Sequence, residues 1–172
     1  LCLGIDFDDV VNYFIKRTWH YVYKLDQINF ISLFNDNGIL NKEYFIKIFE
    51  HLFNSKNMDL KTLTMKEFYD KTQIKLSIFA VNASTFQLKE FNYETTGDIL
   101  LSDAIYFSSC IPSIFKPYEY KGVCYLDGGI HTNSPVDICI KQEKPNLNEV
   151  LGIEIIKDNT LNNPISANDN YL

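Results

Sequence analysis

The 172-residue sequence contains little glycine, proline and arginine and no long hydrophobic run. Its 7 Gly and 5 Pro exclude a collagen-like or Pro-rich disordered chain. No unbroken apolar run exceeds four residues, whereas a membrane-spanning helix needs about 20, so no transmembrane segment is predicted. Arg17 is the only arginine among 16 basic residues, and the net charge is −6, so nothing indicates a nucleic-acid interface.

Cysteine is sparse as well. The four cysteines, at positions 2, 110, 124 and 139, form no C-x-x-C pair, and no histidine stands near them at metal-site spacing. We therefore expect reduced, apolar cysteines in an intracellular protein, with no metal.

Hydrophobic residues are abundant. They make up 46% of the chain, with 13 Phe and 11 Tyr, which is enough for one continuous core. No repeat or linker interrupts the sequence, so residues 1–172 are predicted to form a single domain. Because the sequence opens with Leu-Cys-Leu-Gly and stops in the polar stretch 159–170, we expect an interior part of a longer protein.

Hydrophobic periodicity and capping residues predict several helices. Asp6 is a candidate N-cap, and Thr64 with Glu67 has the spacing of a capping box that opens a short helix. The other helices are expected at residues 6–23, 41–53, 100–109 and from 136 to 141.

Alternating or wholly apolar segments predict strands between these helices. They are residues 74–82, 85–93, 122–126 and 149–156. Strands separated by helices favour an α/β fold with a largely parallel sheet.

The stretch from Tyr125 to Pro135 is the most informative for function. A predicted strand ends at Asp127, and two glycines follow, so the chain can reverse tightly and leave the carboxylate at a strand end. Such a carboxylate could act as a base or a metal ligand. It could equally cap its own turn, since Asp-Gly is a common turn signal.

The preceding segment, residues 104–117, joins with this stretch in a resemblance to the patatin-like phospholipases. In that family a helix is followed by proline and phenylalanine, then by a short strand and an Asp-Gly-Gly or Asp-Gly-Ala motif. The matching residues of the first block are Ser109, Pro112, Phe115 and Pro117. Those of the second are Asp127, Gly128, Gly129, Asn133 and Pro135.

The resemblance covers about residues 1–156, leaving 157–172 as a loop or tail. It implies a three-layer α/β/α patatin-like domain, incomplete at both ends. It further implies a lipid acyl hydrolase with a Ser-Asp dyad and no cofactor, in which Asp127 is the base. The substrate would be a phospholipid or another acyl lipid, and the protein would be cytoplasmic or peripheral to membranes.

One departure from the family concerns the nucleophile. The chain contains no G-x-S-x-G and no glycine-rich oxyanion loop. By resemblance, the serine is expected upstream of Leu1, so the segment alone should be inactive. Two alternatives stay open. One is a catalytically inactive relative that binds lipid or a partner, and the other is an Asp-Gly-Gly loop that binds a metal or phosphate group.

Three further features have alternative readings. His131 could contact substrate, but it is more simply a loop histidine. The aromatic helix at 41–53 could line an acyl-chain site, although packing on a sheet is the commoner role. Ser108 and Ser109 are expected to finish their helix.

Overall fold

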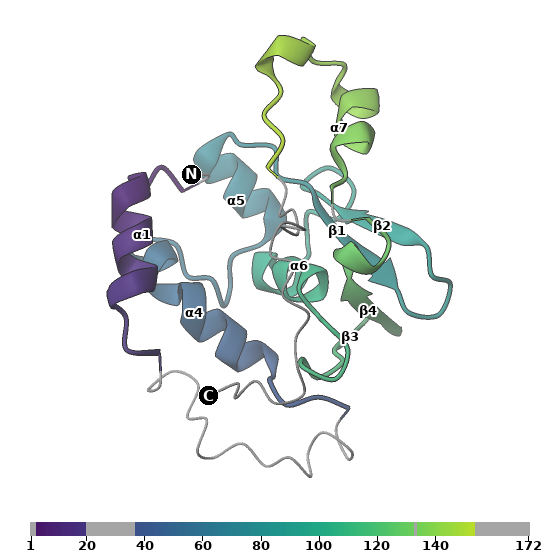
Figure 1. Ribbon diagram of the computed structural model, residues 1–172, viewed down its shortest axis with the longest axis horizontal. Helices are drawn as coiled ribbons and strands as arrows, with labels where there is room; N and C mark the ends of the chain where they lie inside the picture. The colour runs from purple at the N-terminus through teal and green to yellow at the C-terminus, as the bar shows by residue number, and fades with distance from the viewer. Residues whose placement is uncertain (1–2, 20–36, 133, 154–172) are drawn as a thin grey trace, which may run out of the picture. The chain divides into compact units, whose positions relative to one another are not determined.

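The computed structural model describes residues 3–19, 37–132 and 134–153, which are coloured in Figure 1. The chain divides into two compact units, Leu1–Asn133 and Ser134–Leu172, each described by itself. The single domain over residues 1–172 stays a prediction.

The described elements of the first unit are α1 (Phe7–Lys16), α4 (Lys42–Asn54), α5 (Met65–Thr72), β1 (Ile78–Asn82), β2 (Leu88–Phe91), α6 (Leu101–Ser108), β3 (Glu119–Tyr120), β4 (Val123–Asp127) and the 3₁₀ helix η2 (Gly128–Ile130). The second unit contains α7 (Val136–Glu143) and the 3₁₀ helix η3 (Leu147–Glu149).

Side-chain caps explain where three helices begin. The Asn41 carboxamide oxygen accepts hydrogen bonds from two backbone N–H groups in the first turn of α4. Thr64 and Glu67 form the predicted capping box of α5. Asp6 is the predicted N-cap of α1, although this helix ends at Lys16 and the predicted residues beyond 19 lie outside the described ones.

The other helix predictions are confirmed within small shifts of their ends. The helix expected at 41–53 is α4, the one expected at 100–109 is α6, and the one expected from 136 is α7. Pro135 occupies the N-cap position of α7, where its missing N–H is no loss to the helix.

The sheet contains four strands in the order β2-β1-β4-β3. Its three ladders are all antiparallel, which corrects the expectation of a largely parallel sheet for the described strands. Short connections explain the direction of the β1–β2 and β3–β4 ladders, because a parallel neighbour needs a crossover of a dozen or more residues. The β1–β4 ladder joins strands that are distant in the chain, and its direction does not follow from connection length. β3 and β4 are joined by Lys121 and Gly122 alone, with φ of 50° and 78°, as in a tight hairpin. The three-layer arrangement stays a prediction.

Strand positions follow the sequence pattern, but the strands are shorter than expected. Of the strand predicted at 74–82, only Ile78–Asn82 forms β1. Of the strand predicted at 85–93, only Leu88–Phe91 forms β2. The strand expected at 122–126 is β4. The strand expected at 149–156 is not found over residues 149–153, and the remainder of that range lies outside the described residues.

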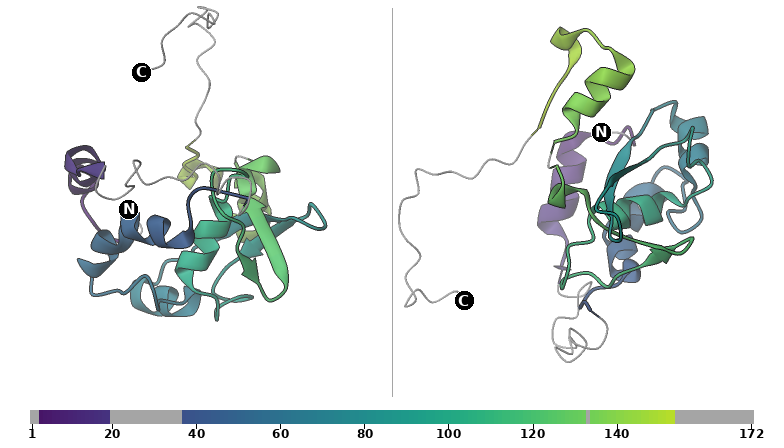
Figure 2. Two further views of the ribbon diagram at one scale, coloured as in Figure 1. Left: turned by 90° about the horizontal axis from the view of Figure 1, so that it is seen from below. Right: turned by 90° about the vertical axis from the view of Figure 1, so that its right-hand side faces the viewer.

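The core of the first unit forms where α6 packs on β1 and β4 (Figure 2). Most residues of α6 are buried, including the polar Ser102 and Asp103, so the helix is enclosed on several sides. Phe107 has no exposed surface, and its ring centroid lies 4.9 Å from that of Tyr125 and 5.8 Å from that of Phe91. Burial of each such ring contributes roughly 1.5–3 kcal/mol. The sheet is therefore held firmly on the face that α6 covers.

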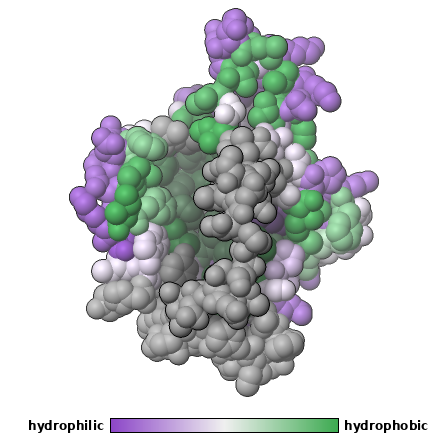
Figure 3. Space-filling view, in the orientation of Figure 1, coloured by the Kyte–Doolittle hydropathy of each residue, from purple (hydrophilic) through white to green (hydrophobic). Residues whose placement is uncertain are grey.

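The outer surface includes the amphipathic helix α1, whose hydrophilic and hydrophobic side chains lie side by side at the left of Figure 3. Phe7 and Ile15 are exposed on it. Among the described residues, no helix has both the length and the apolar character needed to cross a membrane.

Candidate functional site

Asp127 is the last residue of β4, opposite Ala80 of the central strand β1. The backbone turns immediately after it into η2, and its carboxylate oxygen Oδ1 accepts a hydrogen bond of 2.7 Å from the Gly129 N–H. The residue is half-buried. Within the described part of the chain, the second oxygen, Oδ2, accepts no hydrogen bond. A carboxylate held by one oxygen and open at the other has the geometry required of a proton acceptor.

Gly128 is required by a close approach between η2 and the strand β1. It is buried, and a Cβ at this position would overlap the carbonyl oxygen of Phe79 in β1. The first glycine of the Asp-Gly-Gly motif therefore serves tight packing beneath Asp127. The second, Gly129, supplies the N–H that orients the carboxylate.

The two motif blocks identified in the sequence meet at Asp127. Its N–H donates a hydrogen bond of 3.0 Å to the carbonyl of Cys110, just after the end of α6. Ser108 is the last residue of α6 and Ser109 is its C-cap, so both finish the helix as predicted. The Ser109 carbonyl accepts a bond of 2.9 Å from the Ile111 N–H, which turns the chain toward Pro112. The end of α6 is thus fixed to the backbone that carries the carboxylate.

The loop after α6 is anchored at its far end by a buried tyrosine. The Tyr106 hydroxyl donates to the Lys116 carbonyl at 2.7 Å, and Phe115 packs edge-on against the Tyr106 ring. Gly38 comes so close that a Cβ on it would lie 2.5 Å from the Lys116 nitrogen. Pro112 and Pro117 are exposed on this loop. The phenylalanine of the motif is therefore a packing residue, and the prolines shape the loop.

Cys110 has the one clearly perturbed pKa next to Asp127 among the described residues. Its side chain is buried, and burial together with the nearby Asp127 carboxylate raises the pKa of the thiol to about 11. The thiol is thus kept neutral at ordinary pH and is a poor nucleophile. This environment argues against a cysteine nucleophile in the described part of the site.

The rest of the motif falls beyond this cluster. Asn133 lies outside the described residues. Pro135 belongs to the second unit, where it is the N-cap of α7. His131 is exposed, and its backbone N–H donates to the Gly128 carbonyl at 3.0 Å. The structure therefore brings together Asp127, Gly128, Gly129 and the Ser109–Cys110 end of α6.

Among the described residues, no cluster of three or more His, Cys, Asp or Glu side chains could hold an ion. The interactions that the described residues make with Asp127 include the Gly129 N–H, the Cys110 carbonyl and the neutral Cys110 thiol.

Sequence reasoning missed the contribution of Phe79 and Cys110. Both act through the backbone, as the carbonyl that Gly128 packs against and the carbonyl that accepts from Asp127. The only signal for Phe79 was its place in the apolar run of residues 78–81, which predicted a central strand. Nothing in the sequence indicated that the Asp-Gly-Gly turn after β4 packs against Phe79.

Comparisons with known proteins agree with the motif. Residues 1–140, which include both motif blocks, match the family model described as patatin-like phospholipase. The protein named "Probable lipid hydrolase 463L" of Invertebrate iridescent virus 6 is 35% identical over 107 residues, or 62% of this chain. The matched region covers 37% of that relative's length.

Proposed function

Since the chain belongs to the patatin-like phospholipase family, we propose that the protein carrying it hydrolyses acyl esters of lipids. The relative's printed name, which contains the words lipid hydrolase, supports the same reaction class. Phospholipids are the proposed substrates, reached at the surface of a membrane or micelle. The observation that carries the proposal is Asp127 at the end of β4, with one carboxylate oxygen held by the Gly129 N–H.

Asp127 is proposed to be the general base of a Ser-Asp dyad. In the acylation step, a serine Oγ attacks the ester carbonyl carbon while Asp127 accepts the hydroxyl proton. The C–O bond of the ester then breaks, and the proton passes from Asp127 to the departing alcohol. Water, deprotonated by the same carboxylate, then attacks the acyl carbon, the bond between this carbon and the serine Oγ breaks, and the proton passes from Asp127 to the serine Oγ as the fatty acid leaves. No metal enters these steps.

The serine is proposed to lie N-terminal to Leu1, because no serine in these 172 residues is flanked as in G-x-S-x-G. A fluorophosphonate, which modifies activated serines, should label one residue of the full-length protein. Peptide mass spectrometry then locates it. Failure to label any serine would favour the catalytically inactive, lipid-binding alternative.

The direct test of Asp127 is its replacement by asparagine in the full-length protein. The carboxamide of the Asp127→Asn variant cannot accept the proton, yet its oxygen can still accept the Gly129 N–H, so the loop should be retained. We expect kcat for phospholipid hydrolysis to fall by about 10²–10⁴, the usual contribution of a general base. The assay is fatty-acid release in excess EDTA, with circular dichroism to establish folding.

Asp98→Asn is the matched control. Asp98 is exposed and forms a surface ion pair with Lys121, so the same chemical change should leave kcat unaltered. Turnover that survives in Asp127→Asn would refute the base assignment. Turnover that vanishes in EDTA would instead favour a metal-binding Asp-Gly-Gly loop.

A further inference from the structure

Exposed hydrophobic residues gather in the two segments that meet at Asp127. Seven large hydrophobic residues are exposed on the described part of the first unit, and four of them belong to these segments. Ile111 (45% exposed), Ile114 (44%) and Tyr118 (39%) lie in the loop between α6 and β3, and Ile130 (48%) is the last residue of η2. Single exposed apolar residues are ordinary, whereas a group of them marks an interaction surface.

Both segments are bound to the backbone around Asp127. The Asp127 N–H donates a hydrogen bond of 3.0 Å to the carbonyl of Cys110, the residue before Ile111. Ile130 follows Asp127 by three residues, in the turn whose Gly129 N–H donates to the carboxylate. A surface that contacts Ile111 and Ile130 is therefore brought next to this carboxylate.

The loop after α6 is held in shape by backbone hydrogen bonds. The Ile111 carbonyl accepts from the N–H groups of Ile114 at 3.2 Å and Phe115 at 3.0 Å, which closes a tight turn. The Ile114 carbonyl accepts from the N–H groups of Ile39 at 2.9 Å and Leu40 at 2.8 Å. These bonds fix the backbone of the turn, so the loop cannot collapse to cover its two isoleucines.

The same loop carries almost no charge. Lys116 is the only charged residue from Cys110 to Tyr118, and it is half-buried, whereas the whole chain carries a net charge of −6. Attraction to a surface of anionic lipid requires several cations, and this loop offers one. Zwitterionic lipid has no net charge, so apolar side chains can enter it without electrostatic attraction.

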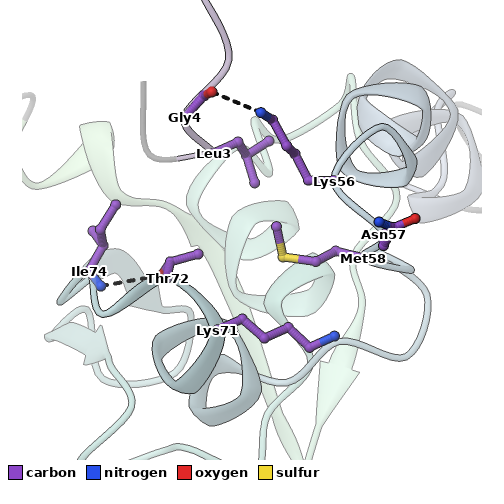
Figure 4. Close-up of a pocket in the computed structure, with 8 residues that line it drawn as sticks. All are labelled: Leu3, Gly4, Lys56, Asn57, Met58, Lys71, Thr72 and Ile74. Carbon is purple, nitrogen blue, oxygen red and sulfur yellow. Dashed lines mark hydrogen bonds between the residues drawn. The ribbon is translucent and has the colours of Figure 1, made fainter.

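Another apolar region of the first unit is concave and separate from these segments. A cavity of about 510 Å³ is lined in part by Leu3, Met58 and Ile74, as Figure 4 shows. None of its lining residues belongs to the loop after α6 or to η2. A recess can hold a small molecule, but exposed side chains on a turn are what enters a lipid layer.

We propose that Ile111, Ile114 and Ile130 form a contact surface for zwitterionic lipid, which brings Asp127 to the membrane or micelle where the ester lies. The choice of a lipid over a protein partner rests on the proposed function, because the ester that reaches Asp127 comes from a lipid aggregate. Tyr118 combines an exposed ring with a polar hydroxyl, which suits the level of the head groups.

Sedimentation of the full-length protein with vesicles tests this contact. The vesicles consist of dialkyl-ether phosphatidylcholine, which contains no acyl ester and is therefore not hydrolysed during the measurement. We expect the wild type to bind and the Ile111→Ser/Ile114→Ser variant to bind at least about tenfold more weakly, because each isoleucine has nearly half its surface free to enter the lipid. Binding should be equal at about 0.1 and about 0.5 M NaCl, since salt screens only charges.

Ile15→Ser/Ile153→Ser is the matched control. It makes the same substitutions at two isoleucines that are more exposed, 75% and 79%, but belong to α1 and to the second unit. The control should bind the vesicles as the wild type does. Circular dichroism establishes that each variant is folded.

A gain of signal tests the same contact without relying on a loss of binding. The new indole of an Ile114→Trp variant should be quenched by spin-labelled phosphatidylcholine in the vesicles, whereas that of Ile15→Trp should not. Both positions are exposed and have room for the larger ring. The wild type, which contains Trp19, supplies the background.

Several results would overturn the proposal. They are a wild type that does not bind the ether vesicles or releases them at the higher salt concentration, an Ile111→Ser/Ile114→Ser variant that binds no more weakly than the control, and equal quenching in the two tryptophan variants. The proposed function fails separately, when a wild type that binds the ether vesicles does not hydrolyse ester-linked phosphatidylcholine.

Discussion

Replacement of Gly128 by alanine should lower both stability and activity, because the backbone leaves no room for a Cβ. An ideal Cβ would overlap the Phe79 carbonyl oxygen and lie 3.1 Å from the Phe79 carbonyl carbon. Both are backbone atoms of β1, so relief requires the loop and the strand to move apart. Overpacking of this kind costs about 1–3 kcal/mol. At about 2–4 °C for each kcal/mol, a cost near 2 kcal/mol should lower Tm by about 4–8 °C.

The same displacement should affect hydrolysis, because Asp127 directly precedes Gly128. A misplacement of about 1 Å at a reacting group can lower a rate about a hundredfold. We therefore expect kcat for phospholipid hydrolysis by the full-length Gly128→Ala protein to fall about a hundredfold. Differential scanning calorimetry and fatty-acid release measure the two effects on one preparation.

Two other glycines serve as controls. In Gly152→Ala the new Cβ lies 3.9 Å from a Val136 methyl, an ordinary contact and the one that the described residues make with it, so Tm should stay unchanged. In Gly38→Ala it would lie 2.5 Å from backbone atoms of Phe115 and Lys116, so Tm should fall as for Gly128→Ala, with a smaller loss of kcat. A wild-type Tm and kcat in Gly128→Ala would refute the close approach of this loop to β1.

Three further predictions concern buried polar groups. Lys42→Met leaves the buried Asp103 carboxylate without its ion-pair partner and should cost about 3–5 kcal/mol in urea unfolding, most of it recovered when Asp103→Leu is added. Ser102→Ala should be neutral or stabilising by about 1 kcal/mol, because the Ser102 hydroxyl is fully buried and bonds to no other described residue. Burial and the Asp127 carboxylate raise the pKa of the Cys110 thiol from 9.0 in the unfolded chain to about 11 in the folded protein. Between these pH values the thiol of the unfolded chain loses its proton first, so the free energy of unfolding should fall as pH rises from 9.0 to about 11. Urea titrations at both ends of the window should show a smaller fall for Cys110→Ala.

Local signals in the sequence were enough to predict most of the helices and the position of the Asp127 carboxylate. Thr64 and Glu67 form the capping box that their spacing predicts, because both partners stand within one turn. Asp127 ends its strand as the two glycines after it indicate. Each of these features depends on neighbours a few residues away, which the sequence displays directly.

Long-range pairing could not be read in the same way. β1 is flanked by β2 and β4, and the antiparallel direction of both ladders follows from connections whose paths the hydrophobic pattern does not encode. The hydrogen bond from Asp127 to the Cys110 carbonyl likewise joins residues far apart in the chain. The motif resemblance named both blocks, but only the fold brings the end of α6 to the carboxylate.

The order of the strands also bears on self-association. β2 and β3 are the outer strands of the described sheet, and outer strands with unpaired backbone groups can add a strand from another molecule. Both are short, and they carry exposed charged residues, Lys89 on β2 and Glu119 on β3. Charges buried between two such edges would lose their hydration. The two polar edges therefore oppose β-type aggregation, while the apolar β1 lies protected between its neighbours.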